Sequence, residues 1–247
     1  MCIEAARINA AMVYVGRELQ GEGYVAGFPN FHQADHGNGV VTAIFLIKGE
    51  AVDFKDISGE RIGNPNRRDV IEMFRIASNL ASEEGYPAAI PSLHHDRSKN
   101  LYGFYFIKPG YVDWQDVKAS DLGNPSGISE RFRAANDYSI KLPYNGAFPN
   151  FHEANYGEGL VYGTYLLKGE AGGLREVPMS ALNMSFYEEV FCTPVMSSSL
   201  VPNIGEISKV CLQSWMGTYV CAESGGGNIV VVNRPVAKEW KPLKCTV

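Results

Sequence analysis

The chain contains two near-copies of one twelve-residue motif. The segment Phe-Pro-Asn-Phe-His-Gln-Ala-Asp-His-Gly-Asn-Gly at 28–39 aligns without gaps with Phe-Pro-Asn-Phe-His-Glu-Ala-Asn-Tyr-Gly-Glu-Gly at 148–159, an offset of 120 residues. The match continues through Lys-Gly-Glu-Ala at 48–51 and 168–171, and a divergent copy, Ile-Pro-Ser-Leu-His at 90–94, lies at the midpoint. Three tandem units of about 60 residues are therefore expected over residues 6–184.

Each unit reads as a helix followed by two strands. Apolar residues recur at helical spacing before each motif: Ile8, Met12, Val15 and Leu19; Val70, Phe74, Ile76, Ala77 and Leu80; and Ile128, Phe132, Ala135 and Ile140. The proline of each motif fits an edge strand or a strand end. A turn and a run of β-branched and aromatic residues follow, which predict a second strand and an α-β-β unit.

One helix on one hairpin buries too little apolar surface to fold alone, so the three units are expected to share one core. The predicted fold class is α+β, with a triple α-β-β repeat domain over residues 1–185. The spacing leaves two arrangements open. The units could add side by side into a six-stranded sheet, which we favour, or close around a pseudo-threefold axis.

After about residue 185 the repeat ends, and residues 186–247 are predicted to form a small all-β segment. Residues 209–245 contain a series of spaced positions with a recognisable pattern: Gly217, Tyr219, Ala222, Glu223, the glycines at 225–227, Val232, Asn233, Arg234, Ala237 and Trp240. They make this segment resemble one repeat of a fascin-like β-trefoil. A complete trefoil needs three such repeats, and this chain has one. The resemblance implies binding of carbohydrate or actin.

Composition narrows the classes of partner. The 247 residues are 45% hydrophobic, and the net charge of −5 is spread along the chain without a basic block. A nucleic-acid partner is therefore not expected. The apolar runs fall short of the ~20 residues that cross a bilayer, so no membrane partner is predicted. The N-terminus lacks a basic stretch followed by an apolar one, which favours a cytoplasmic protein.

Three histidines, His32, His94 and His152, occupy the same place in the three units. Histidine exchanges protons near neutral pH and is the commonest metal ligand, so closure around a threefold axis could bring the three to one metal ion. We favour a structural role in each unit. The pattern of His32 and His36 resembles part of a helical zinc-protease motif, but the flanking proline and glycines exclude the helix. We predict no metal or other cofactor.

The turns after His32 and His152 combine amide, carboxylate and aromatic groups, which suit a sugar or another small polar ligand. The predicted ligand-binding residues are His32, Asp35, His36, His94, His152, Asn155 and Tyr156, with Tyr102, Trp114 and Tyr162 nearby. The favoured function is non-catalytic, lectin-like recognition of a glycan. The alternatives are a hydrolase or lyase that uses a repeat histidine with Asp35 or Glu153, and a structural or cytoskeletal interaction module of the actin-binding type.

Overall fold

The computed structural model describes residues 2–182, 219–222 and 230–234. The chain divides into two compact parts, 1–193 and 194–247. In the second part, β10 (Tyr219–Ala222) pairs antiparallel with β11 (Val230–Arg234). Most residues that carry the fascin-like resemblance lie outside the described residues. Within the described ranges, no helix has the length and apolar character of a membrane span.

The first part mixes helices with antiparallel sheets, as the α+β class predicts. Its helices are α1 (Cys2–Tyr14), α2 (Val70–Glu83) and α3 (Ile128–Ile140). Its strands are β1 (Tyr24–Asp35), β2 (Val40–Lys48), β3 (Val52–Ser58), β4 (Ala88–Asp96), β5 (Leu101–Ile107), β6 (Val112–Lys118), β7 (Gly146–Asn155), β8 (Leu160–Leu167) and β9 (Gly172–Pro178). Short helical turns continue α1 over 15–22 and occupy 49–51, 169–171 and 179–182.

At the starts of α2 and α3, an acidic side chain accepts hydrogen bonds from backbone N–H groups. Before α2, the Asp69 side chain accepts a hydrogen bond from the Glu72 backbone N–H at 3.1 Å. Before α3, the Glu130 carboxylate accepts from the N–H groups of Ser126 and Gly127. The buried face of α2 consists of Val70, Met73, Phe74, Ala77, Leu80 and Ala81, at the spacing that the sequence predicts.

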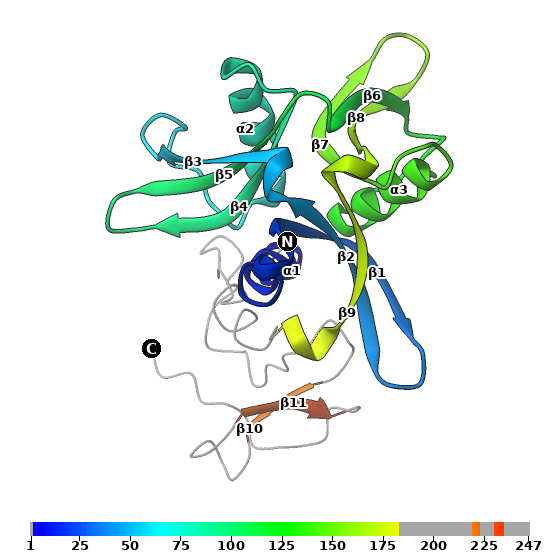
Figure 1. The fold of residues 1–247 in the computed structure, drawn as a ribbon. Coiled ribbons are helices and arrows are strands. Elements are labelled where there is room, and N and C mark those ends of the chain that lie inside the picture. Colours follow the sequence, from blue (N-terminus) through cyan, green and yellow to red (C-terminus); the bar gives the residue numbers. More distant parts are fainter. Residues whose placement is uncertain (1, 183–218, 223–229, 235–247) are drawn as a thin grey trace, which may run out of the picture. The chain divides into compact units, whose positions relative to one another are not determined.

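The strands form three three-stranded sheets, and each hairpin takes its third strand from another segment (Figure 1). We call β1-β2-β9 the first sheet, β3-β5-β4 the second and β6-β8-β7 the third. The strand that follows one hairpin pairs with the central strand of the next, and β9 returns to β2. The connectivity is therefore cyclic, and the prediction of one six-stranded sheet is wrong.

The physical reason lies in the strands that sequence reasoning missed. β3, β6 and β9 share one burial pattern, in which buried residues near both ends flank alternating half-buried and exposed residues. They pair with the open side of a central strand, whose other side already holds the proline-containing strand. Pro29, Pro91 and Pro149 lie in the edge strands β1, β4 and β7, where a missing N–H is tolerated.

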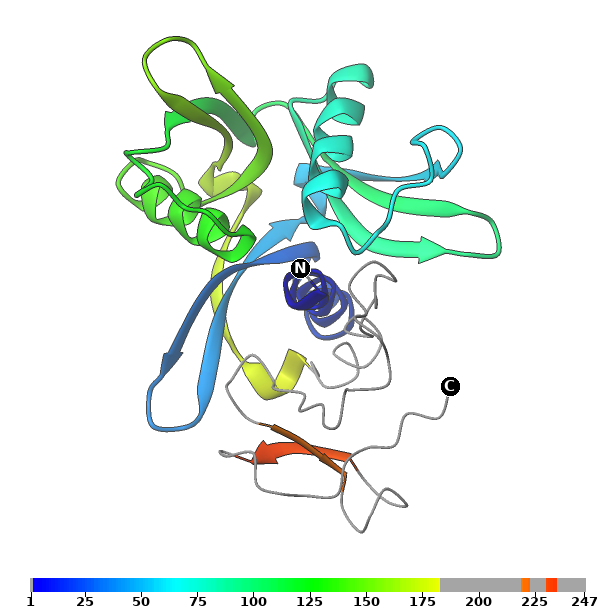
Figure 2. The ribbon, with the colours of Figure 1, turned by 180° about the vertical axis from the view of Figure 1, so that it is seen from behind.

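The helices lie between neighbouring sheets and repeat the same cyclic order. α1 packs against β1 and β4, α2 against β4 and β7, and α3 against β7 and β1 (Figure 2). Each helix therefore contacts the edge strands of two different sheets. This arrangement gives each edge strand two helices to pack against, and a short hairpin needs such partners in order to bury its apolar residues.

Phenylalanine rings from the first and third sheets, α2 and α3 meet in the core. Phe132 lies 5.4 Å from Phe74 and 6.0 Å from Phe151, measured between ring centroids. Phe28 lies 5.3 Å from Phe148. These five rings are almost completely buried. Because they come from distant parts of the chain, no single helix and hairpin could form this cluster alone.

The edge strands bend sharply at one equivalent position. Phe31, Leu93 and Phe151 have positive φ angles of 65°, 57° and 65°, a conformation that costs bulky residues free energy. The pairing register shifts at each bend, and the three side chains are buried. Burial in the core therefore offsets the backbone strain.

We call β3, β6 and β9 the exchanged strands, because each pairs with a hairpin other than the one it follows. In the second and third sheets, a tyrosine–aspartate hydrogen bond joins the exchanged strand to the hairpin with which it pairs. Tyr86 donates to Asp53 at 2.7 Å, and Tyr144 donates to Asp113 at 2.7 Å. Each hydrogen bond lowers the pKa of its carboxyl below the ordinary value, and a nearby lysine, Lys108 or Lys168, lowers it further.

In each of these two sheets, a lysine that follows the central strand also binds this aspartate. Lys108 pairs with Asp53 at 3.2 Å, and Lys168 pairs with Asp113 at 3.1 Å. The first sheet differs, because Gly173 stands where the others have an aspartate. There Arg175 forms two hydrogen bonds to Glu22, at 2.7 and 3.1 Å, and its guanidinium lies over the Tyr24 ring.

Candidate functional site

The predicted ligand residues at the hairpin ends shape their own turns. The Asp35 side chain accepts from the Gly37 backbone N–H at 2.8 Å, and the Asn155 side chain accepts from the Gly157 N–H at 2.9 Å. Asp96 makes the same bond to Ser98 in the middle hairpin. This side-chain-to-backbone turn is the usual role of Asp and Asn in such positions. One side-chain acceptor of each residue is therefore already engaged.

In two hairpins, the residue that follows this Asp or Asn contacts the exchanged strand. His36 Nε2 lies 3.1 Å from Glu176 Oε2 on β9, and the Tyr156 hydroxyl donates to Asp116 Oδ2 on β6 at 3.3 Å. The Tyr156 side chain is 71% exposed. The structure thus places these two predicted ligand residues beside carboxylates that sequence reasoning did not select.

Trp114 lies on the same face of β6 as Asp116 and is 48% exposed. Its indole packs edge-on against Tyr165 with ring centroids 5.0 Å apart. It also covers Gly163 so closely that a Cβ atom there would collide with the ring. The indole is therefore fixed before any ligand arrives. We call the group of Trp114, Asp116 and Tyr156 the Trp114 shelf.

The same position in the other sheets holds a different residue. Phe54 of β3 is 52% exposed and packs against Tyr105 with ring centroids 5.0 Å apart. Leu174 of β9 is 39% exposed and lies opposite Phe45 in the register. The residue that corresponds to Gly163 is Gly103 in the second sheet and Ala43 in the first. Only the second and third sheets therefore present an outward aromatic ring here.

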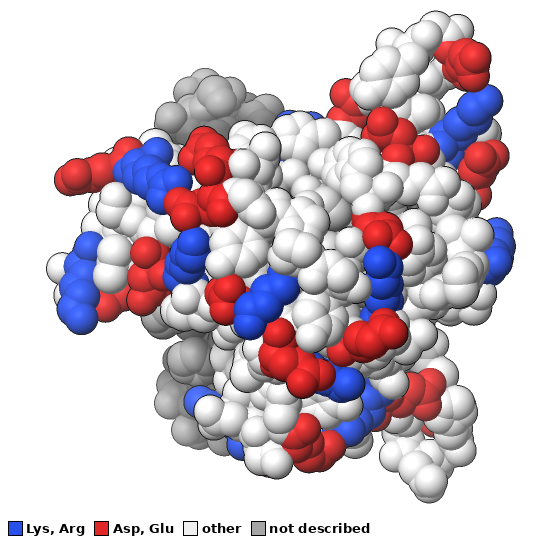
Figure 3. Space-filling model, turned by 45° about the horizontal axis from the view of Figure 1, so that its top comes forward, with Lys and Arg blue, Asp and Glu red and all other residues white. Residues whose placement is uncertain are grey.

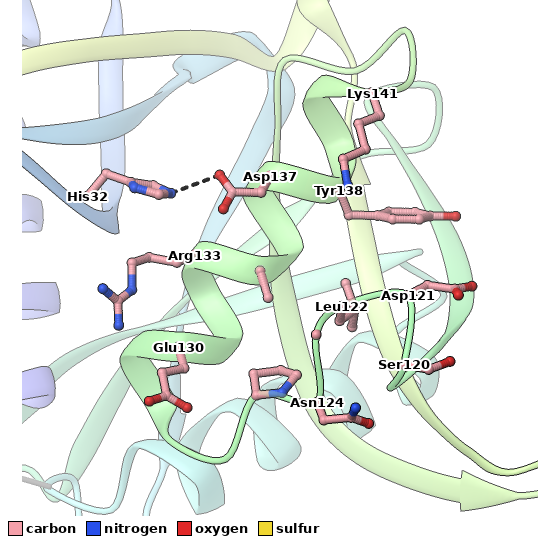
Figure 4. A pocket seen from close by; sticks show the side chains of 13 residues that line it. His32, Ser120, Asp121, Leu122, Asn124, Glu130, Arg133, Asp137, Tyr138 and Lys141 are labelled. Atoms are coloured by element: carbon pink, nitrogen blue, oxygen red, sulfur yellow. Dashed lines mark hydrogen bonds and ion pairs between the residues drawn. The ribbon is translucent and has the colours of Figure 1, made fainter.

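His32 lies away from these faces, at the mouth of a groove on α3 (Figure 4). Its Nε2 is 2.8 Å from Asp137 Oδ1, and both side chains are about half exposed. The buried Arg7 guanidinium donates to the Thr42 hydroxyl, which donates to the His32 carbonyl at 3.0 Å. Burial lowers the pKa of Arg7 to about 10. This chain of hydrogen bonds holds the His32 backbone in place.

The groove has a volume of about 740 Å³ and a mixed polar lining. It is lined by His32, Ser120, Asp121, Leu122, Gly123, Asn124, Pro125, Glu130, Arg133, Ala134, Asp137, Tyr138 and Lys141. Glu130 is engaged at the start of α3, and Figure 4 places Ser120 on the opposite side of the groove from His32. Acidic and basic groups alternate, so the groove favours neither anions nor cations.

The structure separates the three histidines that the sequence aligned. His32, His94 and His152 each follow the bend residue of an edge strand, on three different sheets. His152 is exposed, and His94 lies in β4. Among the described side chains, no group of three or more His, Cys, Asp or Glu residues is arranged to hold a metal ion.

The carboxylates proposed to work with a histidine have other partners. Asp35 bonds the backbone of its own turn, and Glu153 pairs with Arg131, whose guanidinium lies 4.0 Å from the centre of the Tyr162 ring. The carboxylate beside His32 is Asp137, which comes from α3, 105 residues away in the chain. The alternative of a hydrolase or lyase that pairs a repeat histidine with Asp35 or Glu153 stays a prediction, and in the structure these two carboxylates are bonded to other groups.

The face shown in Figure 3 carries no broad region of one charge. Lys and Arg side chains alternate with Asp and Glu around an uncharged central area. Binding to a nucleic-acid backbone relies on clustered positive charge. This face offers no such cluster.

No protein-family model, curated protein or solved structure matches this chain. The functional argument therefore rests on the geometry of its own side chains. Asp116 and Asp137 are the site residues that sequence reasoning missed. Asp116 could have been found from the spacing of acidic residues, since Asp56 and Glu176 lie 60 residues before and after it. Asp137 carried no such signal.

Proposed function

We propose that the chain is a non-catalytic, carbohydrate-binding protein and that the Trp114 shelf is its site. One observation carries the proposal. A half-exposed indole is held over Gly163 and against Tyr165, with the Asp116 carboxylate and the Tyr156 hydroxyl beside it. Sugars offer an apolar CH face and a rim of hydroxyl groups, and this shelf offers a partner for each.

The rigidity of the shelf supports binding. Ordering a mobile side chain on binding costs about 0.5–1.5 kcal/mol, and Trp114 is already ordered by its contacts. Asp116 is held by Tyr156 through Oδ2, and it makes no second hydrogen bond among the described residues. Its Oδ1 atom is therefore placed to accept a hydrogen bond from a sugar hydroxyl while the ring covers the CH face.

The scaffold we propose is three tandem copies of one unit, each a helix, a hairpin and an exchanged strand. The offset of 120 residues in the sequence supports this, as do the identical burial patterns of β3, β6 and β9. The cyclic order of sheets and helices supports it further. In this scheme the shelf is the outward surface where an exchanged strand meets the next hairpin.

The test is a glycan array probed with the full chain, followed by titration calorimetry on the glycans that bind. We expect Trp114→Ala to weaken binding at least tenfold, because it removes the stacking surface. Asp116→Asn should weaken it less, since an amide oxygen still accepts a hydrogen bond. Thermal unfolding followed by circular dichroism checks that each variant is folded.

Asp137→Asn is the matched control, because it changes an exposed carboxylate in the His32 groove and leaves the shelf intact. It should bind the same glycans with unchanged affinity. Absence of any glycan binding would refute the proposal and favour a structural or cytoskeletal interaction module. Loss of binding in Asp137→Asn with retention in Trp114→Ala would move the site to the groove.

A further inference from the structure

We propose that Phe54 forms a second sugar-stacking site, on the second sheet, so that one chain carries two glycan sites of unequal strength. This inference rests on the proposed carbohydrate function and adds a second site and a valency of two. The ligand class is the same, a pyranose ring that presents an apolar CH face. We call the group of Phe54 and Asp56 the Phe54 shelf.

The backbone register places the two rings identically. Phe54 lies opposite Tyr105 in the pairing of β3 with β5, as Trp114 lies opposite Tyr165 in the pairing of β6 with β8. Both ring pairs have centroids 5.0 Å apart. The two faces therefore share one construction, although their segments are far apart in the chain.

A glycine lies beneath each ring. A Cβ atom at position 103 would lie 2.8 Å from Phe54 Cζ, and one at position 163 would collide with the Trp114 indole. Only a residue without a side chain leaves room for a ring at this distance. The ring lies close over the central strand, and Phe54 is 52% exposed, so part of the ring is open to solvent.

A carboxylate stands beside each ring. Asp56 lies opposite Gly103 in the register, as Asp116 lies opposite Gly163. Asp56 is exposed and makes no hydrogen bond or ion pair among the described residues. Its carboxylate is thus available to accept from sugar hydroxyls, which supplies the polar half of the site.

The two shelves differ in ways that predict unequal affinity. A phenyl ring covers less of a sugar than an indole. The middle hairpin has Arg97 and Ser98 near its tip, where the third sheet has Tyr156. The Phe54 shelf therefore lacks the hydroxyl that fixes Asp116, and we expect it to be the weaker site.

The first sheet carries an internal negative control. Leu174 replaces the ring, and Ala43 replaces the glycine. A leucine has no flat face for stacking, and the methyl group of Ala43 occupies the space a ring would need. The geometry therefore assigns two sites to the chain and none to the first sheet.

The experiment measures stoichiometry by calorimetry on the full chain, using methyl β-D-glucoside, methyl β-D-galactoside and methyl α-D-mannoside as separate probes. For the probe that binds, the parent should show two sites with affinities that differ several-fold. Trp114→Ala should leave the weaker site, Phe54→Ala the stronger, and the double variant neither. A multivalent polymer of the same sugar should precipitate only with the parent.

Phe54→Leu supplies a second test that keeps the position apolar, and it should also remove the weaker site. In the opposite direction, Leu174→Trp with Ala43→Gly should add a third site. A single site that is insensitive to both Phe54 variants overturns the inference while the proposed function stands. Absence of binding of all three probes, together with an empty glycan array, overturns both.

Discussion

The first and third sheets use the same frame for different outer surfaces. Both place a proline-containing edge strand, a central strand and an exchanged strand in the same order. Both bring the hairpin end onto a carboxylate of the exchanged strand, through His36 in one and Tyr156 in the other. Yet Trp114 lies over Gly163 in the third sheet, while the first has Leu174 and Ala43. The frame depends on buried positions, and the outer surface depends on one outward residue and the residue beneath it.

A second difference concerns how the exchanged strand is held. In the third sheet, Tyr144 and Lys168 both bind Asp113. In the first sheet the corresponding residue is Gly173, and Arg175 with Glu22 forms the attachment. The comparison teaches that the strand can be attached by different polar groups as long as its ladder of backbone hydrogen bonds is intact.

The largest expected effect is a loss of unfolding free energy that should be the same in the first and third sheets. Phe28 of the first sheet and Phe148 of the third are both fully buried and contact each other. Replacing either with alanine leaves a cavity in the shared core and should cost about 3–5 kcal/mol of unfolding free energy. Urea denaturation of the two variants measures this. A loss confined to one of them would show that the sheets have separate cores.

A smaller loss of stability, which should differ between the two sheets, is expected at the residue beneath the outward side chain. Gly163→Ala forces the new methyl group against Trp114 and Asn150 and should cost about 1–3 kcal/mol, together with the stacking surface. Ala43→Gly in the first sheet should cost at most about 1 kcal/mol, from backbone entropy. Urea denaturation and glycan binding are measured together. Unchanged binding in Gly163→Ala would contradict the fixed position of the indole.

The attachment of the exchanged strand predicts a pH dependence in the third sheet that the first sheet lacks. The hydrogen bond from Tyr144 lowers the pKa of Asp113, so the stability it adds is present above the ordinary value of 3.8 and is lost as the pH falls through the lower, folded value. Tyr144→Phe should therefore cost stability at pH 7, by about 0.5 kcal/mol because the pair is partly exposed, and the cost should shrink in acid.

Tyr24→Phe is the matched variant in the first sheet, where Gly173 offers no carboxylate. Its effect on unfolding free energy should not change between pH 7 and pH 3. Urea denaturation at several pH values tests both variants. An equal cost of Tyr144→Phe at pH 7 and pH 3 would show that the hydrogen bond does not distinguish the two protonation states of Asp113.

The smallest effect is expected at the pair of His32 and Asp137. Exposed ion pairs contribute less than about 1 kcal/mol, and both side chains here are about half exposed. Asp137→Asn should therefore lower the unfolding temperature only slightly and leave the sugar affinity unchanged. A large loss of stability would mean that this contact joins α3 to the first sheet more strongly than its exposure indicates.

Much of the frame could be predicted from the sequence. Periodic apolar residues such as Val70, Phe74 and Ile128 located the helices, and the prolines located the edge strands. These features are local, so they can be recognised within one unit. The strand exchange could not be predicted, because pairing of Val52–Ser58 with the next hairpin depends on contacts between distant segments and leaves no mark on local periodicity.

The candidate site shows the same limit. The turn chemistry of Asp35 and Asn155 and the aromatic character of Tyr156 were visible in the sequence, but their partners were not. Asp116 lies on an exchanged strand, and Asp137 reaches His32 from a different unit. A side chain that acts across units can be found only once the order of the sheets is known.

The return of β9 to β2 has a consequence for synthesis on the ribosome. The hairpin of β1 and β2 ends at Lys48, but its third strand begins only at Gly172. Until that segment emerges, β2 offers an unpaired edge to other nascent chains, and such edges template intermolecular pairing. Long-range pairing of this kind also slows folding. β9 is therefore the last-made of the strands β1 to β9, and it completes the ring of sheets. Until β9 pairs with β2, the same strand of a neighbouring chain can take its place.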